Sequence, residues 1–239
     1  MIPVPDMSET SAKKKRSFRG QSAEQRQAER REKLVAAGLQ LFGTQGFHEV
    51  TVREICAEAH LTERYFYESF RSGDELFAAV YQHLIAGMQN RIFLALPGDA
   101  DPMQIVRRGL SAFLSYVRED PRVARILFVD VPRVRFDQTA VIRKTVASFD
   151  SMVFELAQRL FPKAVHSGLD LVLVAAGLNG SNIAIVSRWV IGGFRESQET
   201  VLENCFAVFA GTAEYMKRLA EERLATRPAA SAGAEYPSE

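Results

Sequence analysis

Apolar residues recur at intervals of three and four positions along most of the chain, and this spacing predicts α-helices. No stretch shows the sustained alternation of apolar and polar residues, bounded by turn residues, that is typical of strands. The helical pattern is interrupted at prolines, which mark helix boundaries because they cannot continue the backbone hydrogen bonding. The pattern therefore predicts an all-α fold of about nine helices. The interruptions fall at Pro97, Pro102, Pro121, Pro132 and Pro162.

The predicted helices divide into a small N-terminal domain and a larger C-terminal one. Residues 1–21 and 224–239 lack apolar periodicity and are predicted to be a flexible basic arm and a disordered tail. Residues 22–72 are predicted to form the first domain, and residues 73–223 the second. Within the second domain, helices are expected over 73–94, 103–119, 121–130, 135–161, 168–193 and 198–223.

Start and stop signals define three helices in the first domain. The first is expected to run from Ser22 to Thr44, because Gly46 supplies a stop. The second begins at Thr51, which forms a T-x-x-E capping box with Glu54. The third follows after a short turn, with Thr62 as its N-cap.

The second and third helices are too short to bury much surface alone, so they must pack on the first helix. Two such helices joined by a three- or four-residue turn are a helix-turn-helix, whose second helix lies in the major groove of DNA. Arg64 is the best base reader by chemistry, since a guanidinium can pair bidentately with guanine. The alternative is an ordinary helical subdomain with a solvated, charged face. The candidate DNA-binding residues are Thr51, Thr62, Arg64, Tyr65, Tyr67 and Arg71, of which Thr51, Tyr67 and Arg71 are the phosphate candidates.

Charge supports a local DNA-binding surface and not a global one. The net charge of the whole chain is only +1, whereas residues 12–31 contain eight basic and two acidic residues. We expect this basic segment to reach along the phosphate backbone or into the minor groove, and its removal to lower both the affinity for DNA and the salt dependence of binding.

The run from Thr51 to Leu76, together with Gly46-Phe47 before it, resembles the DNA-binding segment of TetR-family regulators. Two positions depart from that pattern. His60 stands in the turn where the family usually has glycine, so it must adopt a backbone conformation that histidine tolerates. Gly73 stands where the family favours a phosphate-contacting lysine, a role that the basic segment is expected to take. The family's closing pattern is met by Tyr67, Phe70, Ser72, Glu75 and Leu76.

The resemblance implies a homodimer assembled through the last two helices, which would form a four-helix bundle with those of a second copy. Small residues at four-residue spacing and an apolar seam are the candidates for this interface. The alternative is that both stripes face the core of their own chain. The candidate interface residues are Ala176, Gly180 and Ala184 on one helix and Cys205, Phe209, Thr212 and Met216 on the other.

The resemblance also implies a ligand cavity in the second domain, filled by a largely apolar or aromatic small molecule. Two amides within an apolar helix stand out, because an amide is costly to bury without a partner. The alternative is that these side chains are plain core, or that the amides bond across the dimer or to water. The candidate ligand-binding residues are Phe113, Tyr116, Phe128, Phe149, Met152, Asn179 and Asn182.

The resemblance implies a repressor that a small molecule releases from a near-palindromic operator on double-stranded DNA. The alternatives are a constitutive architectural DNA-binding protein without an effector and a transcriptional activator. An enzyme is not expected, because the four histidines have no metal-ligand spacing and no catalytic or cofactor motif occurs. We expect no metal or cofactor, reduced Cys56 and Cys205, and a cytoplasmic location. No membrane segment is expected, since the apolar run over 171–178 is short.

Overall fold

The computed structural model describes residues 22–96, 101–131 and 139–226, and within these ranges it contains helices and no strand. The prediction of an all-α fold with nine α-helices is confirmed for this part of the chain. The α-helices are α1 (Ala23–Gln45), α2 (Val52–Glu58), α3 (Glu63–Ser69), α4 (Gly73–Ala95), α5 (Pro102–Glu119), α6 (Pro121–Arg125), α7 (Thr139–Leu160), α8 (Leu171–Ile191) and α9 (Gln198–Thr226). The predicted arm over 1–21 lies outside the described residues, as does the part of the predicted tail over 227–239.

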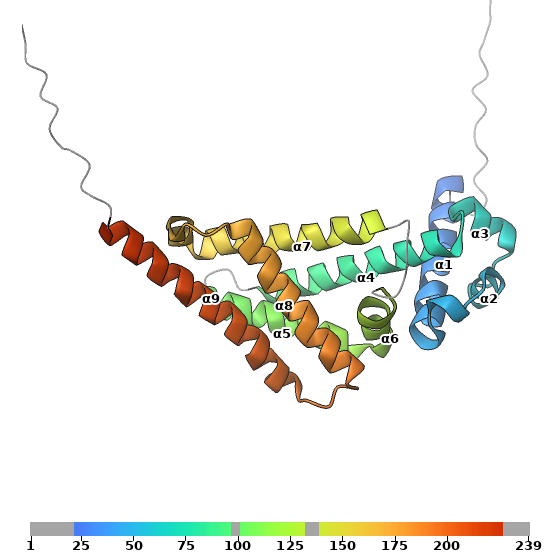
Figure 1. Cartoon of the computed structure of the whole chain (residues 1–239). Coiled ribbons are helices and arrows are strands. Elements are labelled where there is room, and N and C mark those ends of the chain that lie inside the picture. Colours follow the sequence, from blue (N-terminus) through green and yellow to red (C-terminus); the bar gives the residue numbers. More distant parts are fainter. Residues whose placement is uncertain (1–21, 97–100, 132–138, 227–239) are drawn as a thin grey trace, which may run out of the picture.

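Helices α1, α2 and α3 form one end of the molecule, and α4 runs from this end along the larger domain (Figure 1). Side-chain caps fix where these helices begin. Ser22 and Thr51 each form a complete capping box, with Gln25 and Glu54 respectively, and Ser72 accepts a hydrogen bond from the amide of Glu75 at the start of α4.

Aromatic rings fill the space between α1 and α4. The ring of Phe42 lies 5.5 Å from that of Phe77, and Phe47 lies 4.6 Å from Phe77 between ring centroids. Phe66 and Phe70 of the α3 region are almost fully buried below α1. The short helices therefore obtain their stability from packing on α1 and not from their own length.

The segment 121–130 differs from the single helix that was predicted. α6 ends at Arg125 and continues as a π-helical turn, η2 (Ile126–Asp130). The wider turn buries Ile126, Leu127 and Phe128 in succession, which one face of a regular α-helix would not do. This turn lies between the two domains of the chain.

The last two helices cross the face of the larger domain diagonally (Figure 1). α8 begins at Leu171 and not at 168, because Gly168 ends a 3-10 turn with a left-handed backbone (φ 71°) and Asp170 then caps the helix. α9 continues to Thr226, so residues 224–226 are helical although they were predicted to belong to the tail.

By length and composition α8 is the one helix of the described residues that would suit a membrane span, with a mean hydropathy of 1.4. The apolar run over 171–178 does end at Asn179, but the helix continues through the polar residues 179–182 to Ile191. α8 nevertheless packs against α7 and α9, as helices of a helical domain do.

Candidate functional site

Helices α2 and α3 meet at a tight turn, as the helix-turn-helix prediction requires. The amide of Leu61 donates to the carbonyl of Cys56 at 2.9 Å, which closes the turn. His60 has a left-handed backbone (φ 53°), the conformation expected where the TetR pattern has glycine. The prediction that histidine adopts this conformation is confirmed.

Two arginines of α1 hold α3 in place. The guanidinium of Arg30 lies 4.5 Å from the ring centroid of Tyr65, and its NH2 group lies 3.6 Å from the carboxylate of Glu68. Arg31 lies 4.2 Å from the ring centroid of Phe70 and donates to the carbonyl of Ser69 at 3.0 Å. These arginines were assigned to the phosphate-binding segment, whereas their contacts position the recognition helix.

The outer face of α3 is open to solvent. The side chain of Arg64 is 85% exposed and forms a 3.2 Å ion pair with Glu68, one turn along the helix. Tyr67 is 58% exposed, and Thr62 stands at the N-cap with no hydrogen bond from its side chain to the helix. Side chains that can hydrogen-bond to base edges are therefore exposed at the start of α3, which is the part of a recognition helix that contacts DNA.

The two outer phosphate candidates lie at helix starts. Thr51 is exposed, and its hydroxyl donates to Glu54 at 2.7 Å within the capping box. Arg71 is also exposed, and its backbone amide donates to the carboxylate of Glu75 at 2.7 Å beside the start of α4. The backbone amide of Thr51 likewise donates to the Glu54 carboxylate, at 2.8 Å.

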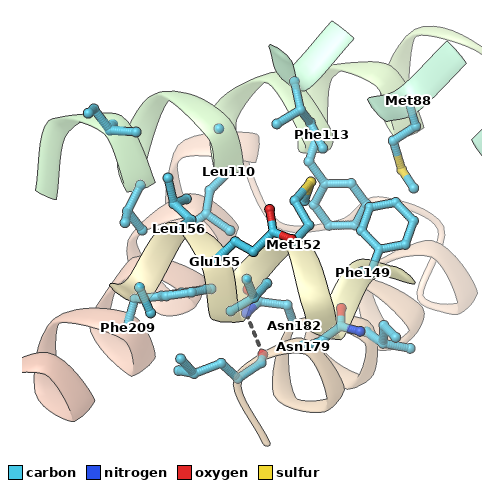
Figure 2. Close-up of a pocket in the computed structure, with 18 of the residues that line it drawn as sticks. Met88, Leu110, Phe113, Phe149, Met152, Glu155, Leu156, Asn179, Asn182 and Phe209 are labelled. Carbon is cyan, nitrogen blue, oxygen red and sulfur yellow. Dashed lines mark hydrogen bonds between the residues drawn. The ribbon is translucent and has the colours of Figure 1, made fainter. Parts of the chain in front are cut away.

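A cavity of about 510 Å³ lies within the larger domain, between side chains of α4, α5, η2, α7, α8 and α9. Figure 2 shows aromatic, Leu and Met side chains surrounding it. Its size falls within the range of small-molecule sites, and its lining is almost entirely apolar. Six of the seven predicted ligand residues line it, namely Phe113, Phe128, Phe149, Met152, Asn179 and Asn182.

Tyr116 is the exception, and its prediction is wrong. Its hydroxyl donates to the carbonyl of Leu84 at 3.0 Å and packs against Gly87, so the side chain joins α5 to α4 outside the cavity. Burial raises the pKa of Tyr116, which keeps the hydroxyl neutral and able to donate.

Five non-aromatic polar side chains interrupt the apolar lining. The amide nitrogen of Asn179 donates to Asp150 of α7 at 2.8 Å, and that of Asn182 donates to the carbonyl of Leu178 at 2.7 Å. The sequence analysis did not identify the other three. Little in the sequence indicates that they line a cavity, because Glu155 and Arg159 lie one turn apart on α7, as the members of many solvent-exposed ion pairs do. These three are Glu155, Arg159 and Thr212.

The predicted interface seam on α9 is wrong, because this face of the helix points into its own chain. Cys205 is fully buried, and burial raises the pKa of its thiol to about 11. Phe209, Thr212 and Met216 line the cavity. Cys56 is also a buried, free thiol, so the expectation of reduced cysteines agrees with the structure.

The predicted small-residue stripe on α8 lies on a different face. Gly180 and Ala184 are exposed and Ala176 is half-buried. Apart from the adjacent backbone of α8 itself, no described atom would lie within 4 Å of a Cβ added at Gly180. Large apolar side chains flank this stripe on the exposed surface. They are Val172, Leu173, Ile183 and Ile191, with exposures of 59%, 70%, 39% and 70%.

The α6–η2 segment touches both the cavity and the DNA-binding domain. Leu127 and Phe128 line the cavity. On its other side, Arg122 donates to the side chain of Gln40 at 2.6 Å, and Arg125 donates to the carbonyls of Thr44 and Gln45 at 2.9 Å, all at the end of α1.

A glycine permits this close approach. A Cβ added at Gly43 of α1 would lie 2.3 Å from the Cβ of Arg122, so no larger residue fits without a shift of the helices. Asp120 caps α6 and receives hydrogen bonds from the Arg122 side chain, which holds the pKa of this carboxyl below its ordinary value. The described residues contain no cluster of three or more ligating side chains suited to a metal ion.

Residues 34–80, which contain α2, α3 and the turn between them, match the family described as "Bacterial regulatory proteins, tetR family". The DNA-binding segment of this chain is therefore of the TetR type. The chain is a helical, DNA-binding transcription regulator.

The chain is also similar to known regulators over a longer stretch. It is 24% identical over 162 residues to the "HTH-type transcriptional activator FasR" of Mycolicibacterium smegmatis, covering 68% of this chain and 73% of the relative. Its fold is shared with the fatty acid degradation regulator FadR of Bacillus halodurans (TM-score 0.65, 14% identity, 75% and 94% of the two chains). It is also shared with FadR of Bacillus subtilis in complex with stearoyl-CoA (TM-score 0.63, 15% identity, 74% and 98%).

Proposed function

We propose that this chain is a ligand-responsive regulator, in which a largely apolar small molecule in the cavity sets the affinity for an operator. The observation that carries the proposal is the position of α6 and η2. One side of this segment forms the cavity wall through Leu127 and Phe128, and the other side binds the end of α1 through Arg122 and Arg125.

This arrangement gives the ligand a direct physical route to DNA. A molecule that needs a different position of Phe128 shifts η2 and hence the two arginines bonded to α1. α1 in turn holds α3 through Arg30 and Arg31. The ligand then favours whichever orientation of α3 accompanies its own best fit, and the size of the effect is its difference in affinity for the two states.

The first candidate for the ligand is a fatty acyl compound. The cavity is lined by many apolar side chains and few polar ones, which suits an acyl chain. The names of two similar proteins point the same way, since one is bound to stearoyl-CoA and one regulates fatty acid degradation. Arg159 at the end of α7 offers a cation to an anionic head group.

The operator is proposed to be near-palindromic, because the exposed face of α8 fits a second copy of the chain. Gly177 and Gly180 leave open space along this face, which lets another helix approach closely, and the flanking apolar side chains gain burial. Two recognition helices would then lie roughly 34–36 Å apart, about one turn of DNA.

Within each half-site, Arg64 is proposed to read a guanine, with Thr62 beside it and Tyr67 at the backbone. The ring of Tyr65 contacts Arg30, so Tyr65 is proposed to contribute less to DNA binding than Arg64 does. Thr51 and Arg71 are proposed to contact phosphates on either side of the groove. Such a regulator acts in the cytoplasm, where bacterial DNA lies.

Selection of bound sequences from a random DNA pool tests the operator part of the proposal. A near-palindromic site with half-sites about one turn apart is expected. Arg64→Ala should weaken binding to the selected site by about 1–3 kcal/mol and relax the preference at one base pair of each half-site. Binding without sequence preference at low salt would contradict it.

Titration of the operator complex with palmitic acid and palmitoyl-CoA tests the ligand part. Release of the DNA is expected for a repressor, and a promoter-reporter assay gives the sign of regulation. The name of the M. smegmatis relative favours the alternative that the chain is an activator. In that case, expression of the reporter should fall when the gene encoding this chain is deleted. DNA binding unaffected by any apolar ligand would favour a constitutive architectural protein.

A further inference from the structure

The carboxylate of Glu68 lies between the proposed base-reading residue and the helix that supports α3. One of its oxygens, Oε1, accepts a hydrogen bond from Nε of Arg64 at 3.2 Å. The other oxygen, Oε2, lies 3.6 Å from a terminal nitrogen of Arg30 on α1. The guanidinium of Arg30 is itself held by the ring of Tyr65, whose centroid is 4.5 Å away. A single carboxylate therefore connects the exposed guanidinium of Arg64 to α1.

The stability of α3 does not account for this ion pair. An acidic residue stabilises a helix better when it precedes its basic partner by four positions, and here Arg64 precedes Glu68. Both charges also oppose the helix dipole, since the cation lies in the first turn of α3 and the anion in the last. Because the side chain of Arg64 is 85% exposed, the pair contributes little to folding.

The bond to Glu68 leaves one edge of the Arg64 guanidinium available to DNA. A guanidinium carries one donor on Nε and four on its two terminal nitrogens. Glu68 occupies Nε, whereas the terminal nitrogens form no hydrogen bond with any of the described residues. Two donors in one plane are what a bidentate contact with O6 and N7 of guanine needs. A carboxylate bound to Nε restricts the rotation of this plane, so less freedom is lost when the contact forms.

We propose that Glu68 is the positioning residue for Arg64, and that it sets base specificity without touching a base itself. Its bond to Nε directs the two terminal nitrogens of Arg64 to a guanine edge. This inference rests on the proposed function, because it requires that Arg64 reads a base. The charge of Glu68 repels phosphates, so Glu68 lowers the affinity for every DNA sequence while it increases the difference between sequences.

The test uses the full-length chain and two DNA duplexes. One is the selected operator, and the other has an A·T pair in each half-site at the position whose preference Arg64→Ala relaxes. Dissociation constants for both duplexes are measured at one salt concentration, and their ratio is the base discrimination. Glu68→Ala is expected to lower this ratio by about threefold or more, since Arg64 then makes the bidentate contact from a less ordered state. Its affinity for the substituted duplex should rise, because a negative charge is removed.

Glu68→Gln separates positioning from charge. Glutamine keeps an oxygen that can accept from Nε of Arg64, so this variant should retain most of the discrimination although it lacks the charge. Glu58→Ala is the matched control, because it removes another exposed carboxylate, at the end of α2. It should change the affinity for both duplexes by the same factor and leave the ratio unaltered.

The outcomes separate this inference from the proposed function. Unchanged discrimination in Glu68→Ala, with discrimination lost in Arg64→Ala, would overturn the inference and leave the proposed base contact standing. An equal loss in Glu68→Gln and Glu68→Ala would assign the effect to charge, and equal weakening of both duplexes would assign it to folding. Either result would overturn the inference, as would an effect of Glu68→Ala on the ratio that persists in the Arg64→Ala background. Base preference unaffected by Arg64→Ala would overturn the proposed guanine contact and the inference together.

Discussion

The two domains differ in how completely they bury their own apolar side chains. Around α3 the large rings are enclosed by the chain itself, with Phe66 at 0% and Phe70 at 1% exposure. In the larger domain, apolar side chains surround an internal cavity and also cover the outside of α8, where Leu173 is 70% exposed. The first domain is complete as a folded unit, whereas the second has surfaces that a ligand and another protein chain would bury.

The largest effect expected from this difference is on stability. Phe66→Ala should lower the free energy of unfolding by about 3–5 kcal/mol, since the ring is fully enclosed. Phe113→Ala, on the cavity wall, should cost about half as much or less, because its ring is only partly buried and already adjoins empty space. Urea unfolding measures both. Equal losses would contradict the contrast between the two domains.

The exposed face of α8 should matter for assembly. Leu173→Glu is expected to convert a dimer into a monomer, because a charge would be buried at the interface, and operator affinity should fall by about 100-fold or more through loss of the second half-site. Sedimentation and a gel-shift titration measure this. Leu94→Glu is the matched control, since Leu94 is equally exposed (72%) but lies on α4. A monomeric wild type, or two variants that behave alike, would refute the assignment of this face.

Contact between the domains can be broken at Gly43. Gly43→Ala places a Cβ against Arg122, so it should destabilise the chain by about 1–3 kcal/mol and weaken the response of DNA binding to ligand. Gly73→Ala is the control, because nothing lies within 4 Å of its added Cβ among the described residues. Thermal unfolding and ligand titrations of the DNA complex report the two effects. A full ligand response in Gly43→Ala would show that coupling takes another route.

The smallest effect is a pH dependence at the same contact. Hydrogen bonds from Arg122 lower the pKa of Asp120 in the folded chain, so its charged form stabilises the fold at any pH above the unfolded-state pKa. This contribution is lost as the pH falls through the lower, folded pKa. Asp120→Asn should therefore cost about 1 kcal/mol at neutral pH and nothing once Asp120 is protonated in both states. Urea unfolding at several pH values gives the difference, and a cost independent of pH would contradict the role of charge.

Local chemistry made the first domain predictable from the sequence. The capping box of Thr51 and Glu54 and the left-handed His60 depend on residues within a few positions of each other, and both were identified correctly. The contacts of Arg30 and Arg31 with α3 join residues more than 30 positions apart, and no local pattern distinguishes them from solvated charges.

Periodicity was less informative in the second domain. Cys205, Phe209 and Met216 do share one face of α9, as predicted, but spacing along a helix does not say what that face meets. It meets the chain's own core and cavity. Tyr116 was misplaced for the same reason, because its neighbour Gly87 belongs to a helix that is distant in sequence.

The separation of roles on α3 bears on how such a protein acquires a new operator. Arg30 and Arg31 secure the helix through Tyr65, Phe70 and the carbonyl of Ser69. Arg64 shares the carboxylate of Glu68 with Arg30, but the outward side chains at 62–64 and 67 take no part in the contacts of these two arginines with Tyr65, Phe70 or the Ser69 carbonyl. Their identities can therefore diversify, in nature or in a library, while the fold and its link to the cavity are retained, so that one sensor can be redirected to a different promoter.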